Sequence, residues 1–521
     1  MSDDEAHQAL IGQHGAYNRA LLDDSEIDDD DERTLRGVKS AGAPGLFVWL
    51  LTAAAGISGL LFGYDTGIIS ATLVSINNSL SGRALTSLDK SLITSSTALF
   101  ALLISPFSSI LADSFGRRRV ILVADGLFII GALVQAVANT VSIMVLGRCI
   151  VGAAVGAASF VVPLYIAEIA PAAHRGRLVT ANVLFITFGQ VVAYIIGWIF
   201  SYCGNPDTAW RWMVGLGAVP AIVQMLLLAG MPETPRWMVR QGNVSGAKQI
   251  VFKANACPPQ VADAIVREIE IEVMHEQEEA AALRVRRARS PGGPSILSDT
   301  CYELLTVPKN RRALVIACLL QGLQQLSGFN SLMYFSATIF TLVGFSMPTL
   351  TSLTVALTNM AFTAIALVTI DRIGRRRILL WSIPMMIVGL LLSAYGFSRL
   401  NLIGSTATSN NPAVVILVSF MIYVAGYAIG IGNVPWMQSE LFPLSVRSLG
   451  SGMSTATNWG ANFIIGLTFL PMMDALTPTW TFVLYACVCG LGHFLIWRIY
   501  PETAGLSLEE VTSLLDEGWG V

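Results

Sequence analysis

Charged residues are scarce in this sequence. Asp, Glu, Lys and Arg together make up 13% of the 521 residues, whereas hydrophobic residues make up 54%. Soluble domains carry about 25% charged residues, so this composition excludes an ordinary soluble globular protein. The formal net charge is only −3, and we expect no nucleic-acid partner.

Motifs for nucleotide-driven work and for catalysis are also missing. The sequence contains no GxxxxGK[ST] loop, which ATP-driven machinery of the P-loop type requires. None of the seven cysteines has the spacing of a metal site, and no loop shows the spacing of a nucleophile and its base. We therefore expect free thiols, no metal, no cofactor and no enzymatic activity, and a driving force, if any, that comes from an ion gradient.

Long apolar stretches dominate what is present. Between residues 46 and 499, twelve stretches approach the ~20 residues needed to cross a bilayer. Most of the 32 Lys and Arg residues fall in the two tails and in the loops on one side, which predicts that both termini are cytoplasmic. We predict an all-α membrane protein with twelve transmembrane helices in two pseudo-symmetric six-helix halves, with additional cytoplasmic helices.

The predicted organisation has five segments. We expect a disordered acidic cytoplasmic tail over residues 1–45, which carry eleven acidic residues against four basic ones. The two six-helix halves are residues 46–230 and 313–499, and a cytoplasmic helical linker, residues 231–312, joins them. A short cytoplasmic tail, residues 500–521, follows the last span.

Three charged signatures occur twice, in the same order and beside apolar stretches. They are D-x-x-G-R-R-R at 113–119 and 371–377, P-x4-E-x2-P-x3-R at 163–175 and 435–447, and P-E-T at 232–234 and 501–503. Each pair is separated by about half the chain. Such repetition predicts a transporter with duplicated halves.

These signatures resemble the sugar porter family of the major facilitator superfamily, over residues 46–517. Within that family the chain is similar to fungal myo-inositol/proton symporters. The resemblance implies alternating-access transport of a small polyol or sugar across the lipid bilayer, by a monomer, with the proton as coupling ion. It is carried by the repeated signatures and by G-Y-D-T-G at 63–67, P-E-T-P-R at 232–236, Q-Q-L-S-G-F-N at 324–330, N-S-L-M-Y-F at 330–335, V-P-W-M-Q-S-E-L-F at 434–442 and T-N-W at 457–459.

Asp65 and Arg148 stand out among the charged residues inside the predicted spans. A charge at the centre of a membrane helix costs roughly 2.5–3.5 kcal/mol, so its presence needs a reason. At about 1.5 Å per residue, both groups lie at similar depths below the outer face. There they can pair, and proton uptake by the acid can compete with pairing. The resemblance also places an acid here in proton-coupled porters. We predict that Asp65 is the proton acceptor and Arg148 its partner; the alternative is a static structural pair.

Neutral amide side chains gather near the predicted midplane. Gln324 and Gln325 follow Gln321 by three and four residues on one helix face, and Gln190 and Asn458 are similarly deep in their spans. Amides offer donors and acceptors without charge, which suits a polyhydroxylated ring. The alternative is hydrogen bonding between helices, or packing. By resemblance, the residues that bind substrate are Gln190, Gln324, Gln325, Asn330, Asn359, Trp436 and Asn458, with Tyr334 as a gate or wall residue.

Charged residues of the repeated signatures lie at the predicted inner helix ends. The resemblance implies a network of salt bridges that forms when the two halves meet and breaks when they part. The alternative is that these charges only set topology and cap helix ends. The predicted members are Asp113, Arg117, Glu168, Arg175, Glu233 and Arg236 in the first half, and Asp371, Arg375, Glu440 and Arg447 in the second.

The leading hypothesis is proton-coupled uptake of myo-inositol, and the predicted location is the plasma membrane. A hexose or other polyol porter, coupled or facilitative, is a rival, because the physics of the cavity residues does not separate ring-shaped substrates. A transporter-like nutrient sensor is a second rival, from a different class. The short C-terminal tail, about 20 residues, argues against a sensor.

Overall fold

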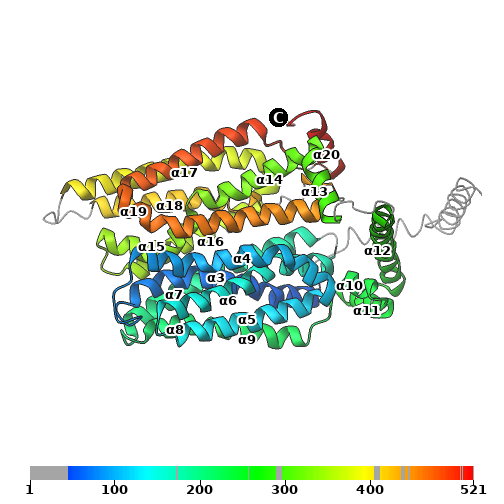
Figure 1. Ribbon diagram of the computed structural model, residues 1–521, viewed down its shortest axis with the longest axis horizontal. Coiled ribbons are helices and arrows are strands. Elements are labelled where there is room, and N and C mark those ends of the chain that lie inside the picture. The colour runs from blue at the N-terminus through cyan, green and yellow to red at the C-terminus, as the bar shows by residue number, and fades with distance from the viewer. Residues whose placement is uncertain are drawn as a thin grey trace, which may run out of the picture.

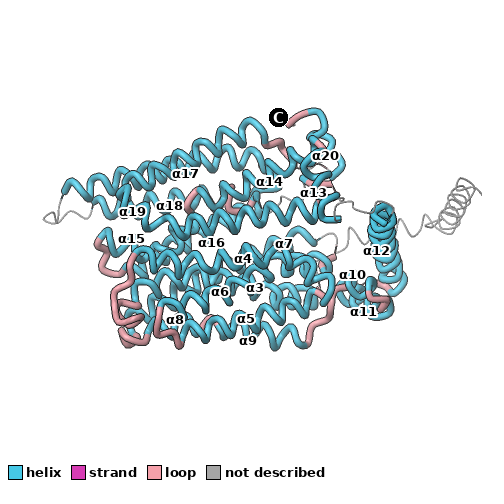
Figure 2. Tube along the Cα trace, in the orientation of Figure 1, coloured by secondary structure: helices cyan, strands magenta, loops and turns pink. Residues whose placement is uncertain are grey.

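The structure is a computed structural model that describes residues 45–171, 174–255, 257–288, 296–403, 411–435, 441–443, 446–504, 506 and 508–519. Every regular element in these residues is a helix. The helices of the main bundle run roughly parallel to one long axis and are joined by turns at its two ends (Figure 2). The predicted tail, residues 1–45, lies outside the described residues except for Gly45.

The first half of the chain forms one layer of the bundle (Figure 1). Its sixth crossing is divided between the short helix α8 and the longer helix α9. The helices of this half are α3 (Leu46–Ser75), α4 (Ser87–Phe115), α5 (Arg117–Ala136), α6 (Val141–Ile169), α7 (Arg175–Cys203), α8 (Ala209–Gly215) and α9 (Ala218–Ala229).

Four helices follow α9, and three of them project from one end of the bundle, which we call the linker end (Figure 1). They are α10 (Pro235–Arg240), α11 (Val244–Asn255), α12 (Pro259–Ala288) and α13 (Ile296–Thr306). The opposite end of the bundle is the far end. The C-terminal helix α20 (Leu508–Glu517) also lies at the linker end, where Arg312 Nη1 donates to its last carbonyls at 2.7 and 2.9 Å.

The second half forms the other layer. Its helices are α14 (Pro308–Leu326), α15 (Phe329–Val343), α16 (Pro348–Ile373), α17 (Arg375–Ile403), α18 (Asn411–Ile429) and α19 (Arg447–Ile499). Helix α19 folds back on itself at Thr477, whose φ is 65°, and so supplies two crossings (Figure 1). The eleven apolar helical segments long enough to span a membrane therefore agree with the twelve predicted spans.

The seventh crossing is broken between α14 and α15. Gly328 has φ 91°, a left-handed conformation that favours glycine, and the ring of Tyr485 lies 3.0 Å from where a Cβ would stand. The carbonyl of Ser327, freed by the break, accepts a hydrogen bond from the Tyr423 hydroxyl at 2.9 Å. Broken helices of this kind occur at the binding sites of secondary transporters.

The repeated signatures meet in space. Glu233, from the first P-E-T, accepts hydrogen bonds from the backbone N–H groups of Arg117 and Arg118 at 3.0 and 3.1 Å. Glu502, from the second P-E-T, accepts hydrogen bonds from the backbone N–H groups of Arg375 and Arg376 at 2.8 and 3.1 Å. A carboxylate at a helix N-terminus satisfies free donors and opposes the helix dipole. Each half therefore fixes the start of its R-R-R helix with its own glutamate.

Candidate functional site

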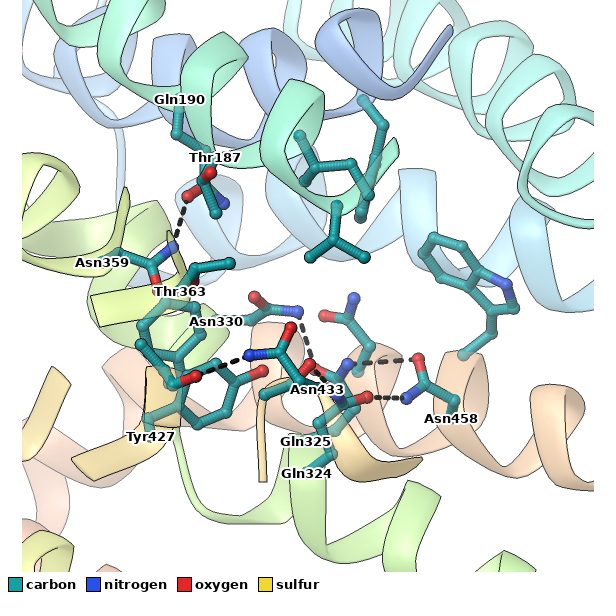
Figure 3. A pocket seen from close by; sticks show the side chains of 18 residues that line it. Thr187, Gln190, Gln324, Gln325, Asn330, Asn359, Thr363, Tyr427, Asn433 and Asn458 are labelled. Atoms are coloured by element: carbon teal, nitrogen blue, oxygen red, sulfur yellow. Dashed lines mark hydrogen bonds between the residues drawn. The ribbon is translucent and has the colours of Figure 1, made fainter. Parts of the chain in front are cut away.

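A cavity lies between the two halves, where α3 and α7 face α14, α15, α16, α18 and α19 (Figure 3). Its walls combine amide, hydroxyl and aromatic side chains. The lining residues are Phe62, Val183, Ile186, Thr187, Gln190, Gln324, Gln325, Phe329, Asn330, Asn359, Thr363, Tyr427, Ala428, Gly432, Asn433, Asn458, Trp459 and Asn462. No Asp, Glu, Lys or Arg is among these described lining residues. The cavity therefore suits an uncharged polar ligand.

Backbone carbonyls fix the direction of the amide network on the second-half wall. Gln324 Nε2 donates to the carbonyls of Ile431 and Gly432 at 3.0 and 2.9 Å, and Gln321 Nε2 donates to Pro435 O at 3.0 Å. Since a carbonyl only accepts, both glutamines must turn their Oε1 atoms the other way. Those two oxygens accept from Asn458 Nδ2 at 2.7 and 2.6 Å.

The amide hydrogen bonds keep the same donor-to-acceptor order from Asn458 to the residues that line the cavity (Figure 3). Asn458 Oδ1 accepts from Gln325 Nε2 at 3.1 Å, and Gln325 Oε1 accepts from Asn330 Nδ2 at 2.6 Å. This series of hydrogen bonds ends at Asn330, whose Oδ1 accepts no hydrogen bond from the described residues. Hydrogen-bonded chains of this kind are strengthened in a low-dielectric interior, so the cavity presents a defined polarity before a ligand arrives.

One hydrogen bond crosses the cavity from half to half. Asn359 Nδ2, on α16, donates to Gln190 Oε1, on α7, at 2.8 Å. Gln190 and Asn359 both line the cavity, and the remaining polar atoms of the two amides, Gln190 Nε2 (a donor) and Asn359 Oδ1 (an acceptor), make no hydrogen bond to another described residue. Two polar groups from opposite halves are thus close enough for one small ligand to contact both.

Aromatic rings supply the apolar surfaces. Phe329 stacks on Tyr427 with ring centroids 3.7 Å apart, and Phe62 meets Trp459 edge-on at 5.6 Å. A ring-shaped polyol carries C–H groups on its faces and hydroxyls on its edge. Aromatic walls beside amides match both kinds of surface.

A buried ion pair lies in the first half. Arg148 Nη1 on α6 donates to Asp65 Oδ1 on α3, and the two side chains are 1% and 8% exposed. Arg148 Nε also donates to Ile93 O at 3.2 Å, which joins the pair to α4. The pairing predicted from matching depths is therefore present; its role in proton coupling remains a prediction.

Four glycines of α3 allow this helix to pack closely against α7. Gly56, Gly59, Gly63 and Gly67 face α7, and a Cβ on Gly63 would stand 3.0 Å from Gln190 N and closer still to Ile186 O. Small residues at this spacing let membrane helices approach closely. Asp65 lies in sequence between Gly63 and Gly67, and both of these glycines pack against the backbone of Gln190.

Hydroxyl groups join the two halves on the far-end side of the cavity. Tyr194 OH, on α7, donates to Met333 O at 2.6 Å and shares a hydrogen bond with Ser336 Oγ at 2.9 Å. Ser70 Oγ, on α3, shares a hydrogen bond with Ser336 Oγ at 3.0 Å and accepts from Ala337 N at 2.9 Å. These buried contacts hold α15 against the first half.

Several of the predicted charges at the linker end are paired within the first half and the linker. Arg117 contacts Glu168 at 2.9 Å and Asp113 at 3.1 Å, joining α5 to α6 and α4. Arg236 on α10 contacts Glu272 on α12 at 3.2 Å. The guanidinium of Arg447 donates to Phe442 O at 3.3 Å. Glu233 caps the helix that starts at Arg117, and Glu502 caps the helix that starts at Arg375, as described above. The opening and closing of this set of charges remains a prediction.

Six predicted substrate residues line the cavity: Gln190, Gln324, Gln325, Asn330, Asn359 and Asn458. Tyr334 lies behind the lining, where its hydroxyl donates to Asn462 Oδ1 at 3.3 Å. Trp436 and Glu440 lie outside the described residues, as do the side chains of Arg175 and Asp371.

Several lining residues were not predicted from the sequence. Asn462 follows Asn458 by one helical turn on α19, so their shared face could have identified it. Asn433 lies in the irregular segment after α18, where no helical periodicity points to the cavity. Thr187, Thr363 and Tyr427 complete the set of missed polar residues.

Two helical halves around a central polar cavity define a secondary transporter of the major facilitator type. Solved structures agree. The chain is similar to the xylose transporter XylE from E. coli in a partially occluded inward open conformation, with a TM-score of 0.74 and 26% identity over 89% of this chain and 100% of that one. It is also similar to the proton:xylose symporter XylE bound to 6-bromo-6-deoxy-D-glucose, with a TM-score of 0.71 and 27% identity over 90% and 99% of the two chains.

The sequence model of the family described as "Sugar (and other) transporter" matches residues 51–515. This chain therefore belongs to that family, whose members are transporters rather than enzymes. It is 46% identical to Myo-inositol transporter 1 of Cryptococcus neoformans, over 91% of this chain and 82% of that protein. It is 43% identical to Myo-inositol transporter 1 of Candida albicans, over 93% and 86%, and 40% identical to Myo-inositol transporter 1 of Saccharomyces cerevisiae, over 95% and 83%.

Proposed function

We propose that this chain carries myo-inositol across a membrane together with protons, by alternating access to the cavity between its halves. The observation that carries the proposal is the charge-free amide cavity packed beside the buried Asp65–Arg148 pair. The names of the fungal relatives, which match more than 90% of this chain, support the choice of substrate.

The cavity chemistry supports an uncharged polyol. Amide donors and acceptors replace water around hydroxyls without the desolvation cost of bringing in a charge. The ligand would contact Gln190 and Asn359 on one side and Asn330 on the other, so its binding would draw the two halves together. A ligand that favours the closed arrangement shifts the population toward it.

The contact between α3 and α7 supports coupling. When Asp65 is ionised, Arg148 stabilises it; when it takes up a proton, the pair weakens and α3 is free to shift. Gly63 and Gly67 then transmit that shift to Gln190, because both contact its backbone. Each proton that moves inward contributes about 2.3 kcal/mol per 100 mV, enough for roughly 50-fold accumulation.

The far-end contacts of Tyr194 and Ser70 support an inward-facing state, with the linker end toward the cytoplasm. In this orientation both termini are cytoplasmic. We propose the plasma membrane as the location and the monomer as the working unit, since one chain supplies both halves of the cavity.

Uptake into proteoliposomes tests the substrate. We expect labelled myo-inositol to accumulate under an inwardly directed proton gradient, and unlabelled myo-inositol to compete better than its isomers, glucose, xylose or sorbitol. If a hexose or another polyol competes more strongly than myo-inositol, that compound is the better candidate substrate and the assignment of myo-inositol is wrong. Specific binding with no flux under any gradient would favour a sensor.

A further inference from the structure

Asn433 lies where α18 ends and the chain turns beside the cavity. The turn is held by Gly432 N, which donates to Tyr427 O at 2.8 Å, and by Asn433 N and Val434 N, which donate to Gly430 O at 3.0 and 3.1 Å. These bonds fix the backbone of Asn433. Its side chain is only 6% exposed, yet it lines the cavity.

The orientation of the Asn433 amide is determined by the backbone. Its Nδ2 donates to Ala428 O, in the last turn of α18, at 2.6 Å. A carbonyl accepts and cannot donate, so the nitrogen must face the helix and the oxygen must face away from it. Figure 3 shows the amide in this orientation, with its oxygen turned toward the space between the labelled amides.

The oxygen of Asn433 accepts no hydrogen bond from the described residues. This distinguishes it from Gln324, Gln325 and Asn458, whose amide oxygens are all occupied within the network. An amide oxygen that lines the cavity and has no donor among the described residues can accept from water or from a ligand. Asn433 Oδ1 is therefore available to a hydroxyl that enters the cavity.

We propose that Asn433 is a specificity-determining residue, whose Oδ1 accepts a hydrogen bond from one particular hydroxyl of the transported polyol. Because the turn and Ala428 hold the amide rigidly, this acceptor selects by hydroxyl position rather than by overall polarity. A substrate without a hydroxyl at that position leaves the acceptor unpaired. The inference rests on the proposed function only in taking the ligand to be a ring polyol or sugar.

A panel of monodeoxy analogues of myo-inositol, one for each ring position, tests the proposal in proteoliposomes. The wild-type protein is expected to disfavour several analogues, with each important hydroxyl worth about 5-fold or more in uptake efficiency. For Asn433→Ala, the ratio of uptake efficiency between myo-inositol and one analogue is expected to fall to about 1-fold. The ratios for the other analogues are expected to stay as in the wild type. Equal loss for every analogue, or unchanged ratios, would overturn the proposal.

A second variant separates the ligand contact from the support given to α18. Asn433→Asp loses the donor to Ala428 but keeps an acceptor oxygen, so it is expected to retain the discrimination that Asn433→Ala loses, even if total uptake falls. If Asp and Ala lose it alike, the side chain acts only by capping the helix. Val183→Ala is the matched control: it changes an apolar lining residue and is expected to alter all analogues by a common factor.

Failure of the proposal for Asn433 can be distinguished from failure of the proposed function. If the wild-type protein takes up no myo-inositol, the substrate assignment fails. The same comparison is then made with deoxy analogues of the sugar that is taken up. If Asn433→Ala loses discrimination at one ring position, the proposed role of Asn433 is still supported. If the variant keeps the wild-type discrimination at every position, that role is still contradicted.

Discussion

Replacing Gly63 by alanine tests whether close contact between α3 and α7 holds the site together. The added Cβ would overlap Ile186 O and would stand 2.8 Å from Ile186 C and 3.0 Å from Gln190 N. These are backbone atoms of a helix, so no side chain can rotate out of the way. The two helices must separate, close to both Asp65 and Gln190.

The expected magnitude follows from that overlap. Overpacking a core costs about 1–3 kcal/mol, and at about 2–4 °C per kcal/mol the apparent melting temperature should fall by roughly 2–12 °C. Gly67→Ala is expected to cost less, because its Cβ would first meet the Cβ of Ala193 at 2.8 Å. Gly490→Ala is the matched control, since nothing lies within 4 Å of its Cβ position.

Thermal unfolding in detergent and equilibrium binding of the substrate measure these effects. Gly63→Ala is expected to unfold at the lowest temperature and to bind most weakly, because Gln190 moves. Alanine at Gly490 should be neutral or slightly stabilising, since alanine is the better helix former by up to about 1 kcal/mol. A Gly63→Ala protein with wild-type stability and affinity would refute the close-packing argument.

Two further predictions concern the ends of the bundle. Glu168→Gln weakens the buried contact with Arg117 and is expected to cost up to about 3 kcal/mol of stability, less than full loss of a buried pair because Asp113 remains a partner; the exposed Arg83→Ala should leave the unfolding temperature unchanged. Tyr194→Phe removes the far-end hydroxyl contacts and should favour far-end opening about 5-fold, measured by spin-label distances between α7 and α15. An unchanged distance distribution would contradict this role.

Much of the fold follows from the sequence because membranes restrict the possibilities. Apolar length predicted the spans, and repeated signatures predicted duplicated halves. The pairing of Asp65 with Arg148 was also predictable, since two isolated charges at one depth in lipid have few other partners. The i, i+3, i+4 spacing of Gln321, Gln324 and Gln325 predicted one polar helix face, and Gln324 and Gln325 line the cavity.

Other features depend on contacts between distant segments. No local pattern shows that Glu233 caps the helix starting at Arg117, because the two are joined only by the fold. The direction of the amide network is set by carbonyls after α18, and sequence periodicity carries no information about them. Asn433 went unnoticed for the same reason.

The central claim is that protonation of Asp65 drives substrate uptake. The direct measurement is myo-inositol accumulation, with simultaneous internal pH, in proteoliposomes under an imposed proton gradient, comparing wild type with Asp65→Asn. We predict that the wild type concentrates substrate and takes in protons with it. The variant should only equilibrate substrate, with no proton entry. Undiminished uphill accumulation by Asp65→Asn would contradict the account.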